Sequence, residues 1–273
     1  MKIIISLLLL VSSHFLSAQF FEFNYLYNFK KDSLSKKNYS EIVSVLVNNN
    51  GRFYRAQNRI ISDSIAYTKN IKYTHPNELI NSTESYTSRV DNVTIEMDLN
   101  TMKKKKWIFT FDKAVANVDD LILPKWSLTN DTIHHQHRIL KKAVTKYLNR
   151  EWIAYYTEEI PMQIAPYTFY GLPGAIVLLE DQNKIFQFEL INYKMKPNLD
   201  NFYETGISFR RKGDFEFLSS KELFKYGNIL LNNSPQLLMN AGLQLEEEKV
   251  KKMEENHKKR KYIFLDPSLP FIL

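Results

Sequence analysis

The stretch Tyr167-Thr168-Phe169-Tyr170-Gly171-Leu172-Pro173-Gly174-Ala175-Ile176 prescribes a backbone path and carries no reactive group. Gly171 and Gly174 permit positive φ or the close approach of another backbone, and Pro173 fixes its own φ and has no N–H to donate. These constraints predict a sharp turn that delivers Leu172 and the strand after it to set positions.

Two interpretations of this turn are open. In the first it is a structural corner that sets the register of the strand beginning near Ile176. In the second its backbone amides form a nest that holds an anion or a partner's carboxylate. The residues assigned to the motif are Trp152, Pro161, Pro166, Tyr170, Gly171, Leu172, Pro173 and Gly174.

The order of a tryptophan-containing strand, Ile160-Pro161, Pro166, an aromatic residue and then Gly-Leu-Pro-Gly-Ala-Ile resembles the GLPGLI family of bacterial envelope proteins. That family is named for its hexapeptide and has no assigned activity. The resemblance covers about residues 131–193 well and the 43–56 hairpin loosely. Leu140 stands where members typically have a cysteine, so any role resting on that cysteine is absent here.

The N-terminus has the layout of a secretory signal peptide, with Lys2, an apolar run over 3–11 and small residues up to Ala18. The run is shorter than the roughly 20 residues of a spanning helix. The chain has no cysteine, which excludes a cysteine-linked lipid and disulfides. We therefore predict a signal peptide over 1–18 and a location in the periplasm or at the outer membrane.

Alternating apolar residues predict four hairpins, the first with the turn signal Asn50-Gly51. Short connections imply antiparallel pairing. The lysine run Lys103–Lys106 is predicted to lie at a solvated hairpin end. The predicted strand pairs are 43–47 with 52–56, 93–99 with 107–111, 143–148 with 152–157, and 176–180 with 186–192.

Helices are predicted over 62–73, 219–231 and 235–260, the last with several Glu-to-Lys pairs at i,i+4 spacing. The predicted fold is mainly β, in the α+β class: a strongly curved antiparallel sheet or half-barrel with a few helices and a long C-terminal helix. The predicted division is a β-rich domain over 19–232 and a C-terminal helix and tail over 233–273.

The formal net charge of +7 favours anionic partners in general. No recognition motif for nucleic acid accompanies the basic runs, so we predict no nucleic-acid partner. Peripheral contact with anionic lipid fits the charge and the predicted export better.

Histidines provide one constellation with catalytic chemistry, because His134, His135 and His137 lie together beside Asp131. In a strand, His135 and His137 would share a face at ligand spacing, although a metal site needs a third ligand. The other interpretation is a solvated polar strand or loop. A serine-hydrolase elbow and phosphate-binding loops are missing from the sequence, and we predict no cofactor and no catalytic residue.

We predict a non-enzymatic binding or carrier module for a lipid or another hydrophobic ligand, with an apolar concavity lined by Trp107, Phe109, Trp152 and Tyr156. Ordinary core packing is the other explanation for these aromatic residues. Two alternative functions stay open. One is an interaction protein that docks on an outer-membrane complex through a sheet edge or the C-terminal helix, and the other is a metal-dependent hydrolase at the histidine cluster.

Overall fold

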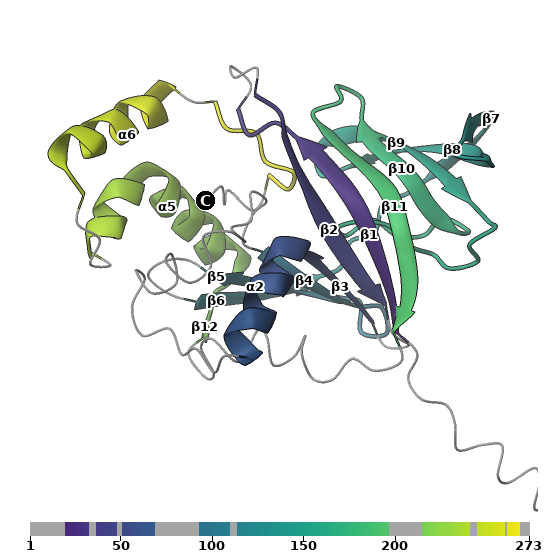
Figure 1. Ribbon diagram of the computed structural model, residues 1–273, viewed down its shortest axis with the longest axis horizontal. Coiled ribbons are helices and arrows are strands. Elements are labelled where there is room, and N and C mark those ends of the chain that lie inside the picture. The colour runs from purple at the N-terminus through teal and green to yellow at the C-terminus, as the bar shows by residue number, and fades with distance from the viewer. Residues whose placement is uncertain are drawn as a thin grey trace, which may run out of the picture.

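A computed structural model describes residues 20–32, 37–47, 51–68, 93–109, 114–196, 215–240, 245–259 and 261–267. Within these residues the fold is one open sheet of 12 strands, in the order β12-β6-β5-β4-β3-β2-β1-β11-β10-β9-β8-β7 (Figure 1). Every neighbouring pair is antiparallel except β12 with β6. The elements are β1 (Phe20–Phe29), β2 (Tyr39–Val47), β3 (Gly51–Ala56), α2 (Gln57–Thr68), β4 (Val93–Asp98), β5 (Lys103–Phe109), β6 (Ala114–Asp120), β7 (Ser127–His135), β8 (Arg138–Tyr147), β9 (Arg150–Thr157), β10 (Ala175–Asp181), β11 (Phe186–Lys196), β12 (Phe215–Phe217), α5 (Ser220–Asn240) and α6 (Glu247–Lys259).

The four predicted hairpins are confirmed as β2–β3, β4–β5, β8–β9 and β10–β11. Leu148 and Asn149 connect β8 to β9 with φ values of 51° and 59°. Two successive positive φ values match the right-handed twist of the flanking strands, which is why two residues suffice for this connection.

Strand β1 was not predicted, yet it lies between β2 and β11 near the middle of the sheet. Its aromatic residues at odd positions from Phe21 to Phe29 alternate with other residues, which is the period of a strand. Asn24 on β1 donates a hydrogen bond to Asn192 on β11, 168 positions away in the sequence. This pairing joins the two halves of the chain into one sheet.

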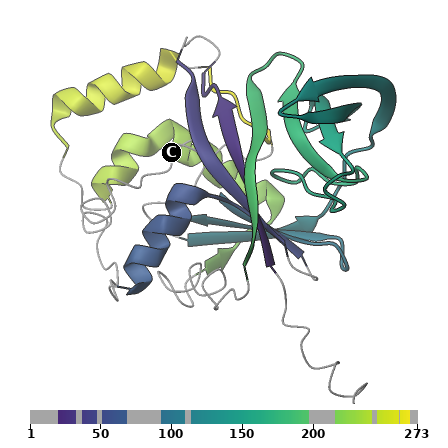
Figure 2. The same cartoon turned by 45° about the vertical axis from the view of Figure 1, so that its right-hand side comes forward.

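The sheet curves around the segment that precedes β10. Five inter-strand steps separate β3 from β9, which is about 24 Å in a flat sheet. Tyr167 nevertheless contacts Tyr54 on β3 and Phe169 contacts Trp152 on β9. The face that these residues share is called the concave face below, and Figure 2 shows the change in strand direction across the sheet.

The lysine run begins directly after the β4–β5 turn, at the hairpin end as predicted, but the prediction that the run is solvated was wrong for two of its lysines. Lys103–Lys106 form the first half of β5, and Lys104 and Lys106 lie on the concave face beside Ile108. Lys104 is 9% exposed and Lys106 is 2% exposed. The period of two along a strand places every second lysine on the buried side, whatever the charge of the segment.

The predicted long helix over 235–260 is not present, because residues 245 and 246 are not helical and α6 begins only at Glu247. Pro235 instead lies inside α5, which has a kink at Asn233. The start of α5 is a capping box: the backbone N–H and hydroxyl of Ser219 both donate to Glu222 Oε2, and the Glu222 N–H donates back to Ser219 Oγ. Helix α2 begins five residues earlier than predicted.

The predicted signal peptide over 1–18 lies outside the described residues. The predicted division of the chain at residue 232 stays a prediction. In the described part of the chain, no helix is both long and apolar enough to cross a membrane.

Candidate functional site

The segment from Ile160 to Gly174, called the motif segment below, fills the concave face of the sheet between β3 and β9. Phe169 is fully buried, and its ring centroid lies 4.7 Å from that of Trp152 and 5.1 Å from that of Tyr147. Leu172 is 2% exposed. The chain therefore covers this part of the concave face with its own aromatic and aliphatic side chains.

The backbone of the motif segment explains why its glycines are needed. Gly171 and Gly174 have φ values of 101° and 141°, which side chains with a Cβ rarely adopt. A Cβ on Gly174 would also overlap the carbonyl oxygen of Thr157. The Gly174 N–H donates to the Leu172 carbonyl at 2.8 Å, and the Ile176 N–H donates to the Ile164 carbonyl at 2.8 Å. These two amides bond to the chain itself, as the structural-corner interpretation expects.

Tyr170 holds the end of the motif segment against two elements. Trp126 Nε1 donates to the Tyr170 carbonyl at 2.8 Å. On the other side, the guanidinium of Arg52 on β3 lies 4.3 Å from the centroid of the Tyr170 ring. Burial lowers the pKa of Arg52, and Tyr170 acts in the opposite direction. The remaining motif residues divide by exposure: Trp152 and Pro166 are buried, and Pro161 and Pro173 are exposed.

The four aromatic residues predicted to line a ligand concavity do not lie on one surface. Trp152 and Tyr156 both face the core from β9, with 0% and 3% exposure. Trp107 lies on the opposite face of the sheet, because its neighbours Lys106 and Ile108 occupy the concave face, and it contacts Phe215 of β12 at 5.0 Å. The side chain of Phe109 lies outside the described side chains.

A cavity of about 760 Å³ opens beside the motif segment, at the mouth of the concave face. Its walls are residues 146–151 around the β8–β9 turn, Ile122, Lys104 of β5, and Asp266 and Pro267 of the C-terminal segment. The C-terminal segment, residues 261–267, reaches this position through an isolated bridge between Tyr262 and Asp32. Leu265 and Asp266 in it are each 5% exposed.

Lys104 supplies a buried cation to the wall of this cavity. Within the described part of the chain, no hydrogen bond or ion pair reaches its Nζ. Burial lowers the pKa of Lys104, and the neighbouring charge of Lys106 lowers it further; Asp266 and Asp119 raise it. The ammonium group of Lys104 is therefore near two carboxylates but makes no direct contact with either.

Tyr147 and Arg150, which also line the cavity, contact other parts of the chain. The Tyr147 hydroxyl donates to the Ile122 carbonyl at 2.9 Å and lies 2.9 Å from Thr168 Oγ1. Burial raises the pKa of Tyr147 to about 12. Arg150 Nη2 donates to the Phe264 carbonyl at 3.2 Å, and its Nη1 lies 3.7 Å from Asp181. The C-terminal segment is thereby tied to the β8–β9 turn.

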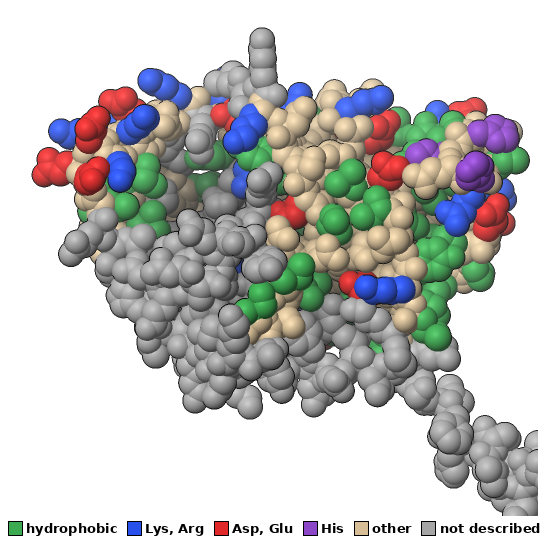
Figure 3. Space-filling model, viewed as in Figure 1, with side chains coloured by type: hydrophobic (Ala, Val, Ile, Leu, Met, Phe, Trp, Pro, Cys, Tyr) green, Lys and Arg blue, Asp and Glu red, His purple; other side chains and the backbone are tan. Residues whose placement is uncertain are grey.

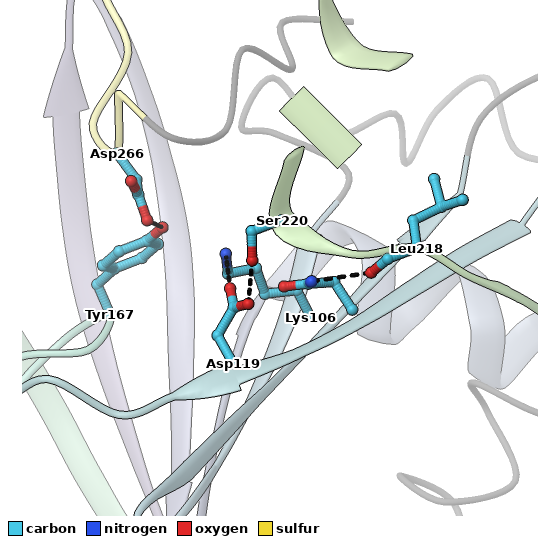
Figure 4. A network of polar contacts seen from close by, with 7 residues as sticks. Lys106, Asp119, Tyr167, Leu218, Ser220 and Asp266 are labelled. Atoms are coloured by element: carbon cyan, nitrogen blue, oxygen red, sulfur yellow. Dashed lines mark hydrogen bonds and ion pairs between the residues drawn. The ribbon is translucent and has the colours of Figure 1, made fainter. Parts of the chain in front are cut away.

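Figure 4 shows two polar contacts on the concave face that differ in role. Tyr167 of the motif segment donates to Asp266 Oδ2 at 3.1 Å. Lys106 Nζ donates to Asp119 Oδ2 at 2.8 Å, and Ser220 at the start of α5 donates to the other oxygen of the same carboxylate. The second contact anchors the start of α5 to β6.

The clustered histidines His134, His135 and His137 lie at the end of the molecule formed by β7 and β8 (Figure 3). Strand β7 ends at His135, and His137 lies in the following turn with φ of 67°, so the two do not share a strand face as predicted. His135 Nε2 lies 3.3 Å from Glu189. The described residues contain no group of three or more side chains that could hold a metal ion. A second cavity of about 760 Å³ adjoins His137, and Arg138 in its wall is paired with Glu159 at 3.3 Å.

The sequence prediction missed the cavity residues Lys104, Tyr147, Arg150 and Asp266. A local signal existed for Lys104, because the period of two in a strand places it on the same face as Lys106 and the apolar Ile108. No local signal existed for Asp266, because its position follows from the docking of the C-terminal segment.

No protein-family model matches the sequence, and no curated protein matches it. Among solved structures, the chain is similar to PNGF-II in two crystal forms, with TM-scores of 0.49 and 0.47 at 16% and 14% identity. These matches cover 75% and 78% of this chain and 32% and 33% of that chain, so this chain spans about a third of PNGF-II. A LolA-superfamily protein of Nitrosomonas europaea matches with a TM-score of 0.29 at 10% identity, over 68% of this chain and 90% of that chain. Similarities this weak do not assign an activity.

Proposed function

We propose that the chain is an exported envelope protein of the GLPGLI type that binds an amphiphilic ligand without transforming it. The observation that carries this proposal is the cavity at the mouth of the concave face, which is lined by the apolar side chains of Ile122 and Leu148 and by a buried lysine. Apolar walls with a few placed polar groups are the usual composition of a small-molecule site.

The cavity is preferred over the deeper concave face because the motif segment already fills that face. Phe169 and Trp152 there are fully buried, and a ligand could enter only by displacing them. The volume of about 760 Å³ at the mouth lies within the range of small-molecule pockets.

Native mass spectrometry of residues 19–273, followed by solvent extraction of the same sample, tests this function. We expect a bound amphiphile that is released on denaturation, or uptake of an added single-chain amphiphile at 1:1 stoichiometry. A chain that carries no ligand and takes up none contradicts the proposal.

Two matched variants locate the binding. Ile122→Asp places a charge on the apolar wall of the cavity, and we expect it to weaken uptake at least tenfold. Ile139→Asp is the control, because Ile139 is also exposed but lies on β8 outside the cavity. Equal uptake by both variants would place the ligand elsewhere.

The edge strand β7 supports a second candidate, docking by strand addition to an outer-membrane partner. Strand β7 is nine residues long, is mostly exposed, and pairs only with β8 among the described strands. An extended partner segment can add to such an edge through main-chain hydrogen bonds. Loss of partner capture from membranes on Thr132→Pro, with uptake of amphiphile unchanged, would favour this candidate.

A further inference from the structure

Lys104 and Lys106 are both buried cations, but they differ in their nearest carboxylate partner. Both lie on the concave face of β5, two residues apart, and both are at least nine-tenths buried. Lys106 has the Asp119 carboxylate at 2.8 Å. Lys104 has no such partner within the described residues, although a buried cation is costly unless it is paired.

The other charged groups in the cavity wall are already engaged. Lys146 lies 3.2 Å from Glu151, and both are largely exposed. Arg150 contacts the Phe264 carbonyl and Asp181. Asp266 is the acid that faces Lys104 from the C-terminal segment, and its Oδ2 accepts a hydrogen bond from the Tyr167 hydroxyl. Lys104 has the nearby charges of Asp266 and Asp119 but no direct hydrogen bond or ion pair among the described residues.

Because this buried ammonium group lines the cavity without a direct partner among the described residues, we infer that the ligand carries one anionic head group, a carboxylate or a phosphate monoester. The head group binds to Lys104 Nζ while the apolar chain lies against Ile122 and Leu148. The inference rests on the proposed function and adds the chemical class of its ligand. A head group at this position gives Lys104 the direct ion pair that the described residues do not supply, and charge-assisted hydrogen bonds of this kind are among the strongest in proteins.

Asp266 competes with such a head group. Its carboxylate lies close enough to raise the pKa of Lys104. An incoming anion must share the ammonium group with Asp266 or move it aside together with the C-terminal segment. Asp266→Asn removes this competing charge, and we expect it to strengthen the binding of anionic amphiphiles about threefold or more.

Binding of three probes with the same chain length tests the inference: dodecanoate, dodecyl phosphate and dodecanol, titrated below their micelle concentrations into delipidated residues 19–273. We expect at least one of the anionic probes to bind ten or more times tighter than dodecanol. Preference between dodecanoate and dodecyl phosphate then identifies the source of the negative charge.

Lys104→Met should abolish the preference for an anionic head while leaving the affinity for dodecanol within about threefold of the original. Lys146→Met is the matched control, since Lys146 also lines the cavity but is exposed and paired, and it should keep the preference. The melting temperature of each variant shows that the fold is retained.

The outcomes distinguish failure of the anionic head group from failure of the proposed amphiphile binding. Equal binding of all three probes by the wild-type chain, or an unchanged preference in Lys104→Met, overturns the anionic head group alone. Binding of none of the probes overturns the proposed function and this inference with it.

Discussion

The two ends of the concave face belong to one sheet but differ in what covers them. At β9 and β10 the motif segment covers the strands, and Phe169 and Trp152 pack there without exposed surface. At β5 and β6 the same face carries Lys104, Lys106 and Asp119, and a cavity opens beside Lys104. The glycine–proline motif thus belongs to the packed end, and the candidate binding site lies at the lysine run.

Phe169→Ala should cause the largest loss of stability, because Phe169 packs against β9 at the covered end of the concave face. Removing a fully buried aromatic side chain that contacts Trp152 and Tyr147 should lower the free energy of unfolding by about 3–5 kcal/mol, measured by urea denaturation. Phe224→Ala is the control, because Phe224 on α5 is exposed, and it should change stability by no more than about 0.5 kcal/mol. Equal effects would mean that the motif segment does not hold the concave face.

Gly174→Ala should be the next most disruptive change. The new Cβ meets the Thr157 carbonyl oxygen, and the residue must keep a positive φ, for a combined cost of about 3 kcal/mol. At Gly171 the same substitution finds ordinary van der Waals space beside Trp126, so only the φ penalty of about 1 kcal/mol applies. Thermal unfolding of both variants tests this order, and a larger loss for Gly171→Ala would contradict it.

Substitutions of the two buried lysines by methionine should change stability in opposite directions. Lys106→Met leaves the Asp119 carboxylate without its cation and should cost about 2 kcal/mol. Lys104→Met removes a buried charge that has no direct ion pair among the described residues, and it should raise the free energy of unfolding by about 1 kcal/mol. Denaturant titration without ligand measures both, and a loss of stability in Lys104→Met would show that its charge is compensated in the folded protein.

The smallest expected effect on stability concerns the N-terminal cap of α5, which adjoins β6. Ser219→Ala should reduce stability by about 1 kcal/mol through loss of the N-cap. Hydrogen bonds from Ser219 lower the pKa of Glu222 below its ordinary value. Because the pKa of Glu222 is lower in the folded state, its ionised carboxylate stabilises the fold at pH values above the pKa of the unfolded state. This contribution is lost as the pH falls through the pKa of the folded state. The difference between wild type and variant should therefore shrink in acid, and a difference that grows in acid would contradict the capping box.

Local chemistry explains which parts of the fold the sequence predicts. Each of the four hairpins has a short connection between alternating segments, and β8–β9 and β10–β11 follow the predicted ranges closely. The pairing of β1 with β11 depends on contacts far apart in sequence, which no local pattern contains. The burial of Lys104 and Lys106 was missed because the composition of the lysine run was given more weight than its period of two.

The candidate site was less predictable than the fold because it is assembled from four distant segments. Lys104, Ile122, the β8–β9 turn and Asp266 meet only after the sheet curves and the C-terminal segment docks. The predicted aromatic concavity failed for a related reason: Trp152 and Tyr156 face the concave side, but the chain covers that side with its own motif segment.

Photocrosslinking tests most directly whether the ligand occupies the mouth cavity and not the packed concave face. A saturated fatty acid with a diazirine next to its carboxylate is bound to residues 19–273, irradiated, and located by peptide mass spectrometry. We expect adducts at Lys104, in residues 146–151 and at Asp266 or Pro267. Adducts concentrated in residues 152–156 and 167–172 would contradict the division of the concave face into a packed end and a binding end.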